Sequence, residues 1–235
     1  MNKLDGMTAI VTGAGRGIGK AIASALASEG AHTVVASRTE RELEALVSDL
    51  RSKGLSAEAM TSDITDDGQA KRLVEFASKH SGRIDILVNN AGMGVLKPFS
   101  QLEVSEFDKM WRLNMRAAFV MTKLALPFMI EQNSGAIVNI ASLAGKNSFV
   151  NGTGYAATKW ALRGWASSLM LEVREYNIRV VTIFPGSVDT TFSPTIKRGD
   201  KITQPQDVAD AVLFAVTAPA RSMFSEIDVR PTNPK

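Results

Sequence analysis

The sequence predicts a doubly wound α/β fold in which a parallel sheet of about seven strands carries helices on both faces. Short apolar runs rich in β-branched residues alternate with longer segments of helical period along the 235 residues. Alternation of this kind builds βαβ units, whose right-handed crossovers give a parallel sheet. A glycine-rich turn follows the first run. Because no internal repeat and no Pro/Gly/Ser-rich linker divides the chain, we expect a single domain over residues 1–235.

The first half of the chain is expected to alternate strictly between strands and helices. Residues 7–12 form a short apolar run that a glycine cluster closes, and helical period begins after the cluster. Thr39 is placed to cap the next, charged helix, and Gly54 follows where that helix should stop. In chain order the prediction is strand 7–12, helix 18–28, strand 31–36, helix 40–52, strand 55–60, helix 66–80 and strand 84–88.

The second half is expected to place a strand between two long helices and to finish with a shorter pair of elements. Its strands are apolar and β-branched, whereas its helices have apolar residues at helical spacing. Residues 187–205 lack either pattern and are a candidate substrate loop. In chain order the prediction is helix 103–130, strand 136–140, helix 154–176, strand 178–183, helix 206–217 and strand 226–229.

Composition excludes several classes of function. The 27 basic and 24 acidic residues give a net charge of only +3, and the basic residues are dispersed, so a nucleic-acid partner is not expected. The chain has no cysteine, which excludes disulfides and thiolate nucleophiles and fits a reducing cytoplasm. Its two histidines, His32 and His80, have no ligand-type spacing, so we expect no metal site.

The sequence also argues against a membrane protein. The first residues lack the apolar core of a signal peptide. The most apolar segment, residues 117–130, is interrupted by Thr122 and Lys123 and is shorter than the roughly 20 residues that a spanning helix needs. We therefore expect a cytoplasmic protein without a membrane partner.

The glycine-rich turn after the first strand is where a doubly wound, or Rossmann, domain binds a dinucleotide. Its pattern is Thr-Gly-x-x-x-Gly-x-Gly, and a helix begins immediately after it. The helix N-terminus supplies free N–H groups for a pyrophosphate, although a glycine-rich turn alone could equally be an ordinary tight turn. The predicted cofactor residues in this turn are Thr12, Gly13, Gly15, Arg16, Gly17, Ile18 and Gly19.

The end of the second strand indicates which dinucleotide is used. NAD enzymes of this class place an acid there for the ribose 2′-hydroxyl, whereas a nearby Arg accommodates the 2′-phosphate of NADP. This chain has Ser37 and Arg38 and no acid, and Arg16 adds a second positive charge. Either Arg alone could be an ordinary solvated charge, but together they predict NADP(H).

Polar residues with catalytic potential follow the fourth and fifth strands. Asn90, Ala91 and Gly92 end the fourth strand, at the sheet edge where ligands bind. Ser142 follows the fifth strand, and Tyr155 and Lys159 have the i, i+4 spacing that places them on one helix face. An adjacent ammonium is expected to lower the pKa of a phenol toward neutrality. An ordinary surface Tyr/Lys pair is the alternative for this spacing taken alone.

Together these motifs resemble the short-chain dehydrogenase/reductase family, in its order and spacing over essentially the whole chain. Within that family, the chain as a whole most resembles the 3-oxoacyl-thioester reductases and their generic relatives. The resemblance implies that Asp63 contacts the adenine, that Asn90 supports the cofactor site and that Asn114 holds a water connecting the catalytic Lys to solvent. It also implies that Val188 and Thr190 hold the nicotinamide carboxamide. The remaining cofactor residues predicted beyond the glycine turn are Ile64, Pro185 and Gly186.

The expected reaction is reduction of a carbonyl by NADPH or the reverse oxidation of a secondary alcohol. Ser142 and Tyr155 would polarise the carbonyl, Tyr155 would transfer the proton, and Lys159 would tune Tyr155 and bind the nicotinamide ribose. The sequence does not decide between small ketones, sugars, pteridines and steroids as the substrate. Two alternatives stay open: a 3-oxoacyl-[acyl-carrier-protein] reductase and a non-catalytic NADPH-binding regulator. Residues 230–234 differ from the Asp-Gly-Gly that those reductases have after the last strand. A hydrolase is not expected because no Gly-x-Ser-x-Gly is present.

The two long helices predict an oligomer. Apolar residues of helices 103–130 and 154–176 spread around much of each circumference. A sheet covers only one face of a helix, and a monomer seldom exposes a large apolar patch. We therefore expect a homodimer or a homotetramer in which these helices meet across a two-fold axis.

Overall fold

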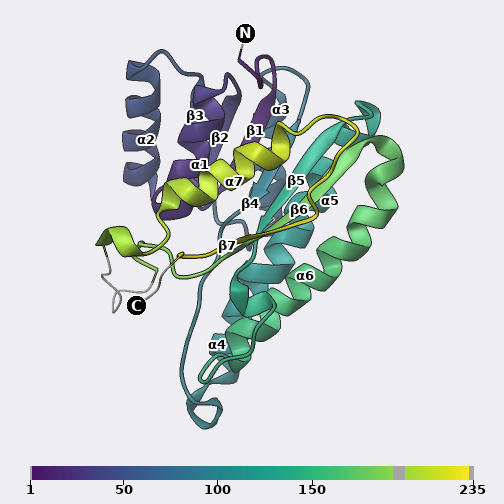
Figure 1. Ribbon diagram of the computed structural model, residues 1–235. Helices are drawn as coiled ribbons and strands as arrows, with labels where there is room; N and C mark the ends of the chain where they lie inside the picture. The colour runs from purple at the N-terminus through teal and green to yellow at the C-terminus, as the bar shows by residue number, and fades with distance from the viewer. Residues whose placement is uncertain (1, 193–198, 233–235) are drawn as a thin grey trace.

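The protein folds around a seven-stranded sheet in the order β3-β2-β1-β4-β5-β6-β7, in which every pairing is parallel (Figure 1). The computed structural model describes residues 2–192 and 199–232. The strand order reverses between β1 and β4, so the crevice at the carboxyl ends of these two strands is the expected ligand site. The strands are β1 (Thr8–Thr12), β2 (His32–Ser37), β3 (Ala57–Thr61), β4 (Ile86–Asn89), β5 (Gly135–Ile140), β6 (Ile178–Pro185) and β7 (Glu226–Val229).

Helices cover both faces of the sheet, as the sequence predicts. α1 (Gly17–Ser28), α2 (Glu40–Ser52) and α7 (Pro205–Val216) cover one face, and Figure 1 shows α1 and α7 side by side. α3 (Asp67–Ser78), α5 (Ala117–Glu131) and α6 (Thr153–Val173) cover the other. Successive strand residues alternate between the faces: Val11 packs in the first layer and Ile10 in the second. The two cores hold the strand ends at fixed positions.

The predicted helix 103–130 is one continuous helix with an irregular middle. α4 (Val104–Trp111) passes into a π-helical segment, Arg112–Arg116, and then into α5. A π-helical turn contains one more residue than an α-helical turn, and such insertions are frequent at functional sites. The segment contains the predicted site residue Asn114.

The length of this helix corrects one expectation. Val104–Glu131 spans 28 residues and, by length and composition alone, is long enough and apolar enough to cross a membrane. The apolar segment was predicted to be too short because only residues 117–130 were counted. Met121, Ala125 and Met129 are nevertheless buried against the sheet, so one face of the helix belongs to the protein core.

Element boundaries otherwise differ from the predictions by a few residues. Helix 40–52 and strand 226–229 are confirmed, whereas β6 continues two residues further than predicted, to Pro185. Thr39 occupies the N-cap position of α2, but its side chain makes no capping hydrogen bond, contrary to the prediction. The backbone N–H of Thr39 donates to Ser37 Oγ at 3.2 Å. Gly54 follows α2 with a φ of +76°, as expected for a helix stop.

Candidate active site

The turn between β1 and α1 has the backbone shape of a phosphate cradle. Gly13 has a φ of +64°, a conformation that side chains disfavour. Gly19 lies so close to Gly13 O and Asn90 Nδ2 that a Cβ at this position would collide with both. The first turn of α1 contains no acid, and no side chain of the described residues caps its N-terminus. Its N–H groups are therefore free for an anion, so the turn fits a dinucleotide pyrophosphate.

Hydrogen bonds join this turn to the end of β4. Asn90 Nδ2 donates to Thr12 O at 2.8 Å and to Gly13 O at 3.1 Å. Thr12 Oγ1 accepts from the backbone N–H groups of Asn90 and Ala91 and donates to Val88 O. Asn90 thus fixes the position of the glycine turn itself, which is a structural basis for the support role that the resemblance implies.

The loop after β6 closes the other side of the same crevice. Thr190 Cγ2 lies 3.3 Å from the position that a Cβ on Gly17 would take, so this predicted nicotinamide contact stands beside the phosphate turn. Val188 pairs with Thr203 in a parallel bridge, and Gly186 N donates to Val229 O at 2.8 Å. The first part of the predicted substrate loop is therefore held by regular backbone contacts.

Charged residues gather at the carboxyl ends of β2 and β3. Asp63 Oδ1 accepts from the N–H and the hydroxyl of Thr65 at 3.0 and 2.7 Å. Partial burial would raise the pKa of Asp63, but these bonds and the charges of Arg38 and Arg112 lower it below its usual value. Asp63 is therefore an ionised acceptor near Arg38, while the adjacent predicted residue Ile64 is buried.

Glu42 also lies beside the glycine turn, although the sequence did not indicate it as a site residue. Its Oε1 lies 3.9 Å from Arg16 Nη1, and its Oε2 lies 2.6 Å from the position that a Cβ on Gly15 would take. The carboxylate therefore stands against the glycine turn and next to Ser37, where a 2′-phosphate is expected. The Arg16 side chain is largely exposed, so this ion pair contributes little to stability and leaves Arg16 free to change partner.

Tyr155 and Lys159 lie buried at the start of α6, close to the ends of β4 and β5. Lys159 Nζ donates to Ile140 O, the last residue of β5, at 2.9 Å, and lies 5.8 Å from the centre of the Tyr155 ring. The same ammonium is 3.6 Å from the position that a Cβ on Gly92 would take. The structure thus places Lys159 near Tyr155, as the i, i+4 spacing predicts, and also brings Lys159 to the segment that follows β4.

The electrostatics of this pair differ from the prediction. Burial raises the pKa of Tyr155 to about 12, although hydrogen bonding with the Ser142 side chain partly opposes it. Burial also lowers the pKa of Lys159 to about 8. The expected lowering of the Tyr155 pKa by the ammonium is therefore not found, because Lys159 bonds a backbone carbonyl and the loss of hydration dominates. In this state Tyr155 is a protonated phenol at neutral pH.

An ion-pair network fixes the segment that carries Ser142. Ser142 Oγ accepts from Ala144 N at 3.1 Å and opens a short helical turn, Leu143–Gly145. Lys146, directly after this turn, bonds Glu226 at 2.9 Å and Asp228 at 2.7 Å on β7. The edge strand therefore anchors the loop that presents the serine.

Asn114 lies at the same site, held by the protein backbone. Its Oδ1 accepts from Met93 N, and its Nδ2 donates to Met93 O, both at 2.8 Å. Nδ2 also donates to Thr158 Oγ1, which in turn donates to Tyr155 O. Asn114 thus joins the loop after β4 to the first turn of α6, and these hydrogen bonds hold the two segments together.

An aromatic side chain covers the proposed substrate side. The Phe192 ring lies 6.0 Å from the Tyr155 ring, and its edge lies 3.0 Å from the position that a Cβ on Gly94 would take. The sequence offers Phe192, Pro194 and Ile196 of the candidate substrate loop as lid residues, and the Phe192 side chain is half-exposed. The other predicted lid residues, Pro194 and Ile196, lie outside the described residues.

The doubly wound sheet with a glycine turn at its switch point defines a protein of the Rossmann class. Residues 7–201 match the family described as short chain dehydrogenase, so the chain belongs to the short-chain dehydrogenase family. An uncharacterized oxidoreductase of Staphylococcus aureus (strain MRSA252) is 37% identical over 232 residues, which cover 98% of this chain and 100% of that protein.

Two solved structures extend this comparison. A metagenomic short-chain oxidoreductase in complex with NADP is 36% identical, with a TM-score of 0.88 over 98% of this chain and 100% of that one. A 7α-hydroxysteroid dehydrogenase complexed with NADH and 7-oxo glycochenodeoxycholic acid is 34% identical, with a TM-score of 0.92 over 98% of this chain and 96% of that one. The seven-stranded architecture predicted from the sequence is therefore that of the family.

Proposed function

We propose that this chain is a cytoplasmic enzyme that uses NADP(H) to reduce a ketone or to oxidise a secondary alcohol, with residues 1–235 as one catalytic domain. The observation that carries the proposal is the convergence of Tyr155 and Lys159 on the crevice that also holds the glycine turn. NADP(H), when bound, supplies the hydride chemistry. The protein then has to orient the substrate oxygen and provide its proton.

Each polar side chain has a separate role in this reaction. Ser142 donates a hydrogen bond to the substrate oxygen, and Tyr155 transfers its phenolic proton to the same oxygen as negative charge develops there. Lys159, as an ammonium, stabilises the phenolate that forms and binds the nicotinamide ribose. A phenol that is protonated at neutral pH suits the acid role, which favours the reductive direction.

The proposed preference for NADP(H) rests on Arg38 and Arg16. Charge-assisted hydrogen bonds to a 2′-phosphate are stronger than neutral ones, and an Arg fork matches phosphate geometry. The solved relative that contains NADP supports this choice, although the hydroxysteroid dehydrogenase was solved with NADH. Glu42 stands in the same region and would repel the phosphate unless Arg16 neutralises it.

Replacing Arg38 with Asp should erase or reverse the preference for NADPH over NADH. The new carboxylate repels a 2′-phosphate and offers an acceptor to a ribose hydroxyl. Glu42→Gln is the matched variant: it removes a negative charge from the same region and should strengthen NADPH binding while leaving NADH binding nearly unchanged. Fluorescence titration of both cofactors measures the effect, and equal affinities of the wild-type protein for NADPH and NADH would contradict the assignment.

The substrate class is best approached by a direct assay. Purified protein is mixed with NADPH and a panel of ketones, including 3-oxoacyl thioesters and oxo-steroids, and the loss of NADPH absorbance is followed. A 3-oxoacyl-[acyl-carrier-protein] reductase would respond to the thioesters alone, whereas a non-catalytic regulator would bind NADPH without oxidising it. Turnover of any ketone that Tyr155→Phe abolishes supports the proposal.

The proposed enzyme is an oligomer that pairs through α4, α5 and α6. Five large apolar side chains on these helices are at least 40% exposed: Val104, Trp111, Phe119, Trp160 and Leu171. Such a surface is costly in water, and one two-fold axis would bury it in both partners. Phe119 also packs on Trp165 at 5.9 Å, which makes the surface rigid and aromatic.

Light scattering of the wild-type protein should give two or four chain masses. Trp160→Glu should shift the protein toward a single chain mass, because a carboxylate would be buried unpaired in the interface. Phe214→Glu, at an exposed aromatic residue on α7, is the control and should leave the α4–α6 pairing intact. A wild-type protein of one chain mass at micromolar concentration would refute the interface.

A further inference from the structure

Both histidines of the chain meet at the end of the sheet opposite the active site. His32 is the first residue of β2, and His80 lies in the turn after α3. Their rings stack with centres 3.5 Å apart and planes 8° apart. This pairing could not be predicted because the two positions are 48 apart in the sequence, and their spacing predicts no metal site.

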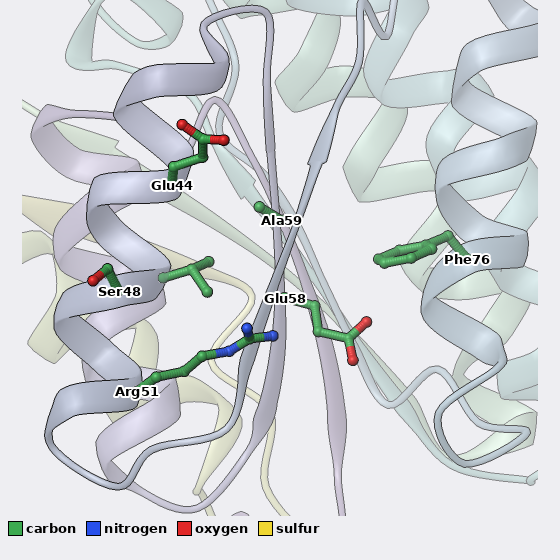
Figure 2. Close-up of a pocket in the computed structure, with 7 residues that line it drawn as sticks. Glu44, Ser48, Arg51, Glu58, Ala59 and Phe76 are labelled. Atoms are coloured by element: carbon green, nitrogen blue, oxygen red, sulfur yellow. The ribbon is translucent and has the colours of Figure 1, made fainter.

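Strand register adds a carboxylate to the histidine pair. Val34 pairs with Glu58 of β3, and His32 lies two residues before Val34, so His32 and Glu58 project from the same face of the sheet. α3 covers that face, and Figure 2 shows the Glu58 side chain on the α3 side of β3. One ligand atom from each of His32, Glu58 and His80 lies within 4.8 Å of the other two.

The buried imidazole of His32 is prepared to act as a ligand. Its side chain is only 5% exposed, and Nδ1 lies 2.7 Å from Ser56 Oγ. Nε2 is buried and has no hydrogen-bond partner among the described residues. A buried nitrogen without a partner is costly, whereas a ring held by its other nitrogen is the usual arrangement of a metal-ligating His.

Charge at this position is compatible with a cation. Burial lowers the pKa of His32, as do the nearby His80 and Arg51, while Glu58 raises it. Arg51 is a nearby positive charge that disfavours a cation here. Its Nε donates to Ala57 O at 2.9 Å, and Figure 2 shows it reaching β3 from α2, on the side away from α3.

We propose that His32, His80 and Glu58 form a Zn²⁺ site that joins the end of α3 to the β2–β3 edge of the sheet. Two imidazole nitrogens and one carboxylate oxygen are an established zinc ligand set, and water fills the fourth position. Zinc requires nitrogens about 2.0–2.1 Å from the metal. The exposed His80 must therefore rotate out of its stack on His32, which its place at a helix end permits.

Calorimetric titration of ZnCl₂ into untagged, metal-free full-length protein at pH 7.5 tests the site. We expect one Zn²⁺ per chain and a rise in Tm with zinc, with no response to Ca²⁺ or Mg²⁺, which prefer oxygen ligands. His80→Ala and Glu58→Gln should each weaken binding by at least about tenfold. Both side chains are accessible, so neither variant should unfold the protein.

Glu75→Gln is the matched control, because Glu75 is an exposed carboxylate on the same α3 helix. It should bind Zn²⁺ as the wild-type protein does, and NADPH affinity should be the same with and without zinc. If wild-type protein binds no Zn²⁺, or if His80→Ala binds it equally well, the proposal is wrong. The result is independent of the proposed enzymatic activity, since the site lies at the opposite end of the strands.

Discussion

Tyr155→Phe is expected to reduce kcat by about a thousandfold, within the range that a positioned proton donor contributes. The substitution removes only the hydroxyl, and the ring keeps its packing against Phe192. NADPH binding, measured by fluorescence, should change little because the phosphate turn is untouched. Ser142→Ala is the comparison: it removes a hydrogen bond to the substrate oxygen and should cost a smaller factor.

The Tyr155 result has a clear negative outcome. If the Phe variant keeps most of its kcat on a substrate that the wild-type protein turns over, Tyr155 is not the proton donor. The position of Ser142 would then make its hydroxyl the next group to test.

Lys159→Met is expected to abolish most turnover and at the same time to stabilise the fold. Burial lowers the pKa of Lys159 from 10.5 to about 8, a shift worth roughly 3 kcal/mol against the charged form at pH 7. Met fills a similar volume without a charge, although it forfeits the hydrogen bond to Ile140 O, worth about 1 kcal/mol. Urea unfolding at pH 7 should therefore show a more stable variant, and a less stable one would contradict the assignment.

The sign of the pH dependence follows from the same shift. The folded protein holds fewer protons on Lys159 than the unfolded chain does between pH 8 and 10.5, so this group makes stability rise with pH across that interval. The difference in stability between Lys159→Met and wild type should be largest below pH 8 and should shrink above it. For ketone reduction, kcat/KM should fall above about pH 8 as the ammonium is lost.

The fold and the main site residues could be predicted because their signals are local. The turn from Gly13 to Gly19 and the Tyr155–Lys159 spacing each lie within one strand-turn-helix unit or one helix turn. The parallel sheet then brings the strand ends together at one edge, so the crevice follows from the element order. Strand boundaries were predicted less well where backbone pairing continues beyond the apolar run, as it does at Pro185.

Contacts between distant segments could not be predicted. Glu42 looks like an ordinary acid in the first turn of a helix, and only the fold places its carboxylate beside Gly15. The Tyr155 pKa was predicted in the wrong direction because helical spacing shows that Lys159 is near but not that both groups are buried. The meeting of His32 and His80 likewise depends on the length of α3 and on the register of β2.

The π-helical segment Arg112–Arg116 has a consequence for engineering chimeras within this family. One extra residue rotates everything after it by about 100° relative to an uninterrupted α-helix. A graft that joins α4 from one relative to α5 from another without that residue would therefore turn Asn114 away from Met93 and move Phe119 from the exposed face. Exchanges made at Val104 or after Glu131 would preserve the helical phase, so these helix ends are the natural crossover points.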